Sequence, residues 1–176
     1  VDADFSSGVR EGVAMHWDDT SSLIVNGTKY ENSTSNVLTN NPGDALFPTA
    51  MHPTTFSAAT TVLKASAAYS VDFDLIDADF RSIWKCGSNY QINYTLGARY
   101  VRFDEDFAAE YVFNNTDIVT SKTSFDGAGI RFGLDGERFR CGNTGLSLYS
   151  KVFANFLAGQ ARGQFYQADN GGVVRV

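Results

Sequence analysis

A regular alternation of side-chain character over residues 89–103 is the feature that most constrains what this chain can form. The even positions from Tyr90 to Tyr100 are apolar or aromatic, whereas the odd positions between them are Gln, Asn, Thr, Gly and Arg. Successive side chains of a β-strand point to opposite faces, so this segment predicts a strand with two unlike faces. The aromatic-rich face suits lipid, and the face that carries Arg99 suits a water-filled lumen.

Similar alternation recurs along the chain and predicts about six strands. We expect strands near residues 1–17, 21–30, 57–84, 89–103, 122–139 and 144–167, long connections at 31–56 and 104–121, and short ones at 18–21, 85–88 and 140–143. All long connections would then lie at one end of an up-and-down sheet, as in outer-membrane barrels. The expected fold is all-β, an antiparallel up-and-down transmembrane β-barrel. It forms a single domain over residues 1–176 and belongs to a larger barrel, because such barrels rarely have fewer than about eight strands.

The apolar positions change parity within the segment 57–84, at Leu75 and Ile76. One extra residue at this point, a β-bulge, would keep both sets of apolar side chains on the same face. Counting back from the turn at 85–88 through such a bulge places Asp74 opposite Arg99. We therefore predict this ion pair.

The net charge of −6 gives the chain no basic surface for nucleic acid. No apolar run approaches the roughly 20 residues of a transmembrane helix, but a barrel strand needs only about ten alternating residues. The chain therefore remains compatible with a membrane protein that crosses the bilayer with strands.

Charged residues of both signs share the parity expected to face inward, which suits a hydrated lumen with cross-strand ion pairs. The lumen-lining candidates are Asp72, Asp74, Arg99, Arg131, Asp135 and Lys151. Glycines 127, 129 and 133 share this parity and would let another segment approach closely. The alternative is a soluble sheet whose charged face points to water.

Aromatic residues flank the ends of the predicted strands. The candidates for two interfacial girdles are Trp17, Trp84, Tyr90, Tyr100 and Phe139. Aromatic side chains at both ends of a spanning strand are typical of membrane interfaces.

No residue pattern points to catalysis. His16 and His52 lack a neighbouring nucleophile motif, so the chain is not expected to be an enzyme, and no cofactor or metal is expected. Cys86 and Cys141 both lie at predicted short turns, hence at the same end of the sheet. Both a disulfide between them and two free thiols fit this placement.

Two patterns carry a resemblance to a known family. The first is Gly97, Arg99 and Tyr100 within residues 70–105, after an aspartate-rich strand and a turn that contains Cys86. The second is a G-x-G-x-R-x-G-L-D strand made of Gly127, Gly129, Arg131, Gly133, Leu134 and Asp135. Together with the small-residue strand that follows, they resemble the Legionella-type major outer membrane proteins, a family of pore-forming barrels. The resemblance implies an outer-membrane channel or structural barrel in a bacterium and supplies no catalytic residues.

The expected function is therefore a porin-like passive diffusion channel or a structural protein of the bacterial outer membrane. Its expected partners are membrane lipid and small solutes or ions, with a homo-oligomer or an envelope partner left open. One alternative is a soluble or secreted β-barrel or sandwich binding protein with its apolar face inside. Another is a surface or adhesion protein anchored by a barrel, whose connections at 31–56 and 104–121 would bind a partner.

Overall fold

The computed structural model describes residues 6–41, 50, 62–112, 116–139, 147–169 and 172–175. They form one antiparallel sheet of seven strands, whose order in the sheet is their order in the sequence. The strands are β1 (Gly8–His16), β2 (Ser21–Thr39), β3 (Lys64–Gly87), β4 (Tyr90–Val112), β5 (Thr116–Phe139), β6 (Ser147–Asp169) and β7 (Gly172–Arg175). The predicted all-β, antiparallel up-and-down fold is confirmed. Within the described residues, no helix is long and apolar enough to cross a membrane.

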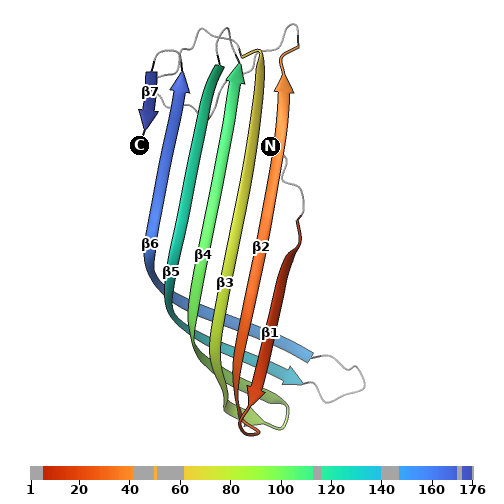
Figure 1. The fold of residues 1–176 in the computed structure, drawn as a ribbon. Coiled ribbons are helices and arrows are strands. Elements are labelled where there is room, and N and C mark those ends of the chain that lie inside the picture. The colour runs from red at the N-terminus through yellow and green to blue at the C-terminus, as the bar shows by residue number, and fades with distance from the viewer. Residues whose placement is uncertain are drawn as a thin grey trace.

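The long strands lie side by side, and the ends of β3–β6 near the turn at residues 88–89 bend across the sheet (Figure 1). β1 and β7 pair on one side only among the described residues, so the sheet does not close on itself. An open sheet of this kind is consistent with one part of the wall of a larger barrel.

Burial distinguishes the two faces of the bent sheet. Asp77 and Asp135, with 0% and 2% exposure, lie on the face that we call the inner face. Ile76 and Phe156, with 53% and 64% exposure, lie on the opposite, outer face. By register, the inner face carries the even residues of β1 and β2, the odd residues of β3 up to Ile83, and the odd residues of β4–β6.

Three strands extend beyond their predicted bounds by six residues or more. β2 continues to Thr39, β4 continues to Val112, and β5 begins at Thr116. The predicted long connection at 104–121 is therefore wrong and shrinks to residues 113–115, while the one at 31–56 becomes residues 40–63. The added strand segments carry polar residues on their outer face, such as Asp104 and Asp106, and this made them look like loops. The predicted sorting of two long connections to one end is also wrong.

The bulge expected at Leu75 and Ile76 is absent. Both residues keep the regular register, opposite Val101 and Tyr100. The register shifts instead between Ile83 and Lys85, so the extra residue is Trp84 at the end of β3. The apolar residues thus change face at Leu75 and Ile76 while the backbone continues without a shift.

The turn between β1 and β2, residues 17–20, is held by a local side-chain contact. The backbone N–H of Thr20 donates to Oδ1 of Asp18 at 2.7 Å, and the Thr20 hydroxyl donates to the same oxygen at 2.7 Å. These two hydrogen bonds stabilise the charged carboxylate and lower the pKa of Asp18. An aspartate that accepts a bond from the backbone two residues later is typical of tight turns.

Candidate lumen-facing charge network

The centre of the inner face is an aspartate that accepts hydrogen bonds from two arginines. Arg99, directly opposite Asp77 in the register, donates from Nε to Oδ1 at 2.6 Å and from Nη2 to Oδ2 at 2.9 Å. Arg131 of β5 donates from Nη1 to the same Oδ2. Asp77 thus links three consecutive strands through charge-assisted bonds, the stronger class of protein hydrogen bond.

A glycine allows β5 to reach β3 across the strand between them. Gly97 of β4 lies opposite Asp79 on one side and Arg131 on the other. A Cβ at this position would overlap Oδ1 of Asp79. Without that atom, Nη1 of Arg131 comes within 3.3 Å of Oδ2 of Asp79.

A second ion pair crosses β4 in the same way, closer to the turn at 88–89. Arg81 of β3 donates to Asp135 of β5 from Nε at 3.0 Å and from Nη2 at 2.5 Å. The amide of Asn93 in β4 also donates to Asp135, at 2.8 Å, and itself accepts from Gln91 at 2.8 Å. Side chains of β3 and β4 therefore both bind the same carboxylate of β5.

An aromatic ring covers the network from β6. The guanidinium carbon of Arg131 lies 3.6 Å from the ring centroid of Phe153, and Nζ of Lys151 lies 4.7 Å from it. A Cβ at Gly133 would overlap the same ring. Two cations thus contact one aromatic ring, a favourable arrangement when the charges are partly desolvated.

The network combines three aspartates with three arginines, so their formal charges cancel before Lys151 is counted. Arg131 is 3% exposed and Asp79 is 4% exposed. Such buried charges persist only when they are paired and hydrogen-bonded. Oδ1 of Asp79 and Nε of Arg131 nevertheless have no hydrogen-bond partner within the described part of the chain.

The structure brings four of the six lumen-lining candidates together. Arg99, Arg131 and Asp135 belong to the network, and Lys151 joins it over the Phe153 ring. Asp72 and Asp74 were placed wrongly, because without a bulge at Leu75 and Ile76 they lie on the outer face. The predicted pair between Asp74 and Arg99 is therefore also wrong: Asp74 lies opposite Arg102, and Arg99 binds Asp77.

The most deeply paired carboxylate, Asp77, was missing from the six candidates, as were Asp79 and Arg81. The sequence holds a signal for them, since D-x-D-x-R at residues 77–81 places three charges on one face of a strand. An uninterrupted register counted from β4 would have found these residues.

The outer face at the same level is apolar and exposed. We call it the apolar belt; it comprises Val25, Ile76, Phe80, Tyr94, Leu96, Ala98, Tyr100, Ala128, Ile130, Phe132, Leu134, Val152, Ala154, Phe156 and Ala158. A contiguous exposed apolar surface opposite a buried charged one reverses the usual arrangement of a soluble protein. This reversal is what a wall between lipid and an aqueous lumen requires.

The girdle candidates lie near the ends of the belt. Trp17 stacks edge-on against Phe80 with ring centroids 6.5 Å apart, and Phe80 lies 6.3 Å from Tyr94. Trp84 is 68% exposed, and Tyr90 is half-buried at the start of β4. At the other end of the belt is Tyr100, whose hydroxyl donates to Oδ2 of Asp126 at 2.9 Å. The side chain of Phe139 lies outside the described residues.

The remaining candidates do not form a site. His16 is exposed at the end of β1, and His52 lies outside the described residues. Cys86 is a free, exposed cysteine, and Cys141 lies outside the described residues, so the structure gives no support to a bond between them. In the described ranges, no group of three or more His, Cys, Asp or Glu side chains is arranged to hold a metal ion.

Comparison with protein families identifies a match over almost the whole chain. The family model described as Legionella pneumophila major outer membrane protein precursor matches residues 1–175. No curated protein and no solved structure matches the chain.

Proposed function

The chain belongs to the family of the Legionella pneumophila major outer membrane protein precursor and is thereby a protein of the bacterial outer membrane, and from this premise we propose that it forms part of the wall of a passive diffusion pore. Membership of this family removes the alternative of a soluble binding protein. The proposal concerns the passage of small solutes and ions, for which the inner face of the sheet supplies the lining.

The observation that carries the proposal is the position of the charge network directly behind the apolar belt. Ile76 and Asp77 are neighbours in β3, yet the first is 53% exposed on the outer face and the second is fully buried on the inner face. A wall with lipid on one side needs polar groups on the other side only if that side meets water. The inner face therefore has the chemistry of a hydrated lumen at the depth of the belt.

The network also supports an expectation about the ion selectivity of the pore. Asp77 and Asp135 are each neutralised by arginine, so neither presents an isolated charge to a passing ion. The side chain of Arg81 is 34% exposed and Lys151 is exposed, which leaves cationic groups at the edge of the network. We expect a wall of this kind to discriminate weakly between anions and cations.

The direct test is conductance in planar lipid bilayers with the native protein purified from outer membranes. Stepwise increases of current that scale with salt concentration are expected. A parallel gel with boiled and unboiled samples in SDS serves as the control, because a folded barrel migrates differently until it is heated. Protein that shows this shift yet gives no conductance would contradict the pore and favour a structural or adhesive barrel.

A further inference from the structure

The outer face of each of the strands β2–β6 changes from apolar to polar part-way along its length, and in β3 and β4 the inner face changes in the opposite sense. In β4, the outer face is apolar up to Tyr100 and then carries Arg102, Asp104 and Asp106. The inner face changes from polar to apolar, from Arg99 on the side of the turn at 88–89 to Phe103 on the other side. Because β4 keeps its register through this point, a bulge does not cause the exchange.

The change on the outer face occurs at the same level in five strands. The last apolar row on the outer face pairs Gly27, Ile76, Tyr100, Ala128 and Ala158. The next outer row pairs Lys29, Asp74, Arg102, Asp126 and Gln160, and we call it the boundary row. A change of polarity that follows one row across β2–β6 indicates a change of the surrounding medium rather than a local irregularity.

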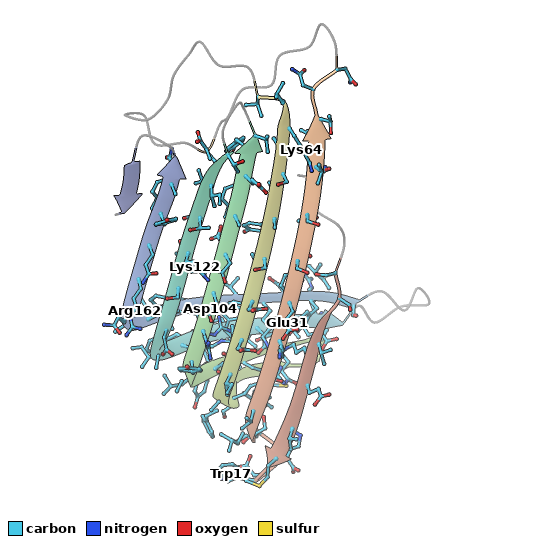
Figure 2. All side chains as sticks on the ribbon, turned by 45° about the horizontal axis from the view of Figure 1, so that its top comes forward. Trp17, Glu31, Lys64, Asp104, Lys122 and Arg162 are labelled. Atoms are coloured by element: carbon cyan, nitrogen blue, oxygen red, sulfur yellow. The ribbon has the colours of Figure 1, made fainter. Side chains whose placement is uncertain are left out.

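Beyond the boundary row, the sheet resembles that of a soluble protein. The inner face there carries a core that comprises Val62, Ala109, Tyr111 and Val119, with Ala65, Ala67, Phe107 and Phe165 packed against it. The outer face carries exposed ion pairs, Lys29 with Glu31, Arg102 with Asp104, and Lys122 with Asp106. Figure 2 shows the labelled Glu31, Asp104, Lys122 and Arg162, which come from four different strands, along this part of the sheet.

The strands are longer than is needed to cross the membrane, so part of each can lie in water. β3–β6 have 23 or 24 residues each, whereas a spanning strand needs about 9–11. From Tyr90 to Tyr100, β4 rises about 33 Å along its own direction, which at a tilt of about 40° gives a height of about 25 Å. This height equals that of the apolar band of an outer-membrane barrel. The segment from Arg102 to Val112 therefore extends beyond the hydrocarbon layer.

We propose that the boundary row marks the surface of the membrane, and that the parts of β2–β6 beyond it form a wall in water outside the cell, the side on which barrels have their longer loops and at which the connection 40–63 lies. The outer face of this wall contacts water, and the outer face of the belt contacts lipid. The inference rests on the membrane placement of the belt and not on pore activity, so a failure to conduct would leave it intact.

Two alanines on one face of one strand provide a matched test. Ala98 and Ala108 both lie exposed on the outer face of β4, on opposite sides of the boundary row. Each is replaced by cysteine, with Cys86 and Cys141 changed to serine, and carries a nitroxide spin label in the full-length protein in lipid bilayers. Collision rates with oxygen, which concentrates in lipid, and with a water-soluble nickel chelate then report the local medium.

We expect the logarithm of the ratio of oxygen to nickel collisions to be positive at position 98 and negative at position 108. The same reversal is expected on β5 between Ala128 and Lys122, which protects the test against failure of one variant to fold. Oxygen-dominated collisions at both positions of a pair would overturn the proposal by placing the whole strand in lipid. Nickel-dominated collisions at both would overturn it by removing the belt from the membrane.

Discussion

The hydroxyl of Tyr100 donates a hydrogen bond to Oδ2 of Asp126 over 2.9 Å, and this contact joins the last apolar row of the outer face to the boundary row. The ring belongs to the belt and the oxygen reaches the first line of charged residues on the neighbouring strand. A tyrosine whose apolar body faces lipid and whose hydroxyl faces polar groups is typical of a membrane interface. Tyr100 therefore marks the same level that the exchange of faces indicates.

The first prediction concerns Asp77, which binds two arginines, one from β4 and one from β5. Asp77→Ala is expected to destabilise the protein by about 3–5 kcal/mol, because both guanidinium groups would stay buried with less countercharge. The measurement is the temperature at which the band of the folded protein is lost from unboiled SDS gels. Asp72→Ala is the matched control, since this aspartate of the same strand is exposed on the outer face. Equal effects of the two variants would contradict the assigned faces.

The second prediction concerns Gly97. Gly97→Ala is expected to cost about 1–3 kcal/mol, because the new methyl group occupies the space of the Asp79 carboxylate and overpacks the network. Gly27→Ala is the control: a methyl group on this exposed glycine of β2 would have no neighbouring atom within 4 Å, so the change is expected to be neutral or slightly stabilising. Urea-induced loss of tryptophan fluorescence in detergent measures both. A stable Gly97→Ala variant would show that β3 and β5 do not meet across β4.

The third prediction concerns the apolar belt. Leu96→Arg is expected to make insertion less favourable by about 2–4 kcal/mol, the usual effect of an arginine on a lipid-facing position near the middle of a barrel strand. Ala108→Arg on the same face is expected to have almost no effect, because that position lies beyond the boundary row. Refolding into lipid vesicles at increasing urea gives both values. A tolerated arginine at position 96 would argue against lipid contact there.

The fourth prediction concerns ion selectivity and depends on the proposed pore. Arg131→Ala removes a cation that Asp77 and Asp79 share, so the lining gains negative charge and the reversal potential is expected to shift towards cation preference. Arg99→Ala is expected to act in the same direction. Arg102→Ala on the outer face serves as the control and is expected to leave the potential unchanged. Unchanged potentials in both inner-face variants would contradict their place in the lining.

The fifth prediction concerns orientation. Cys86 lies exposed at the end of β3 opposite to the boundary row, so it is expected on the periplasmic side. In a Cys141→Ser background, a maleimide on a large polyethylene glycol chain should leave Cys86 unmodified in intact cells and should modify it after the outer membrane is disrupted. A cysteine at position 108 should react in intact cells. The reverse pattern would invert the orientation proposed here.

The sequence predicted the sheet but not the level at which its surroundings change. Alternation over residues 89–103 correctly indicates an antiparallel strand with unlike faces, and the family resemblance is confirmed by the match over residues 1–175. The error began at Leu75 and Ile76, where a change of parity was interpreted as an extra residue. Parity alone cannot separate a bulge from a strand that leaves the membrane, because both move apolar side chains to the other parity.

The same ambiguity explains the other differences. Asp104 and Asp106 looked like loop residues because a strand with a charged outer face was not expected, although Phe103 and Phe107 supply its inner face. Asp74 was paired with Arg99 for the same reason, whereas Arg99, Arg131 and Asp135 share the inner face and one network of ion pairs. The true bulge at Trp84 had no signal in the sequence, since it lies where the strand turns.

If the proposed pore is correct, the glycines of the inner face have a consequence for its width. Arg131 extends along the sheet over Gly97 instead of standing away from it, and Phe153 does the same over Gly133. A lining built in this way places its charges in a layer about one side chain thick. The cross-section left to solutes is then set by the number of strands in the complete barrel, and the charge of the wall can change by substitution without narrowing the passage.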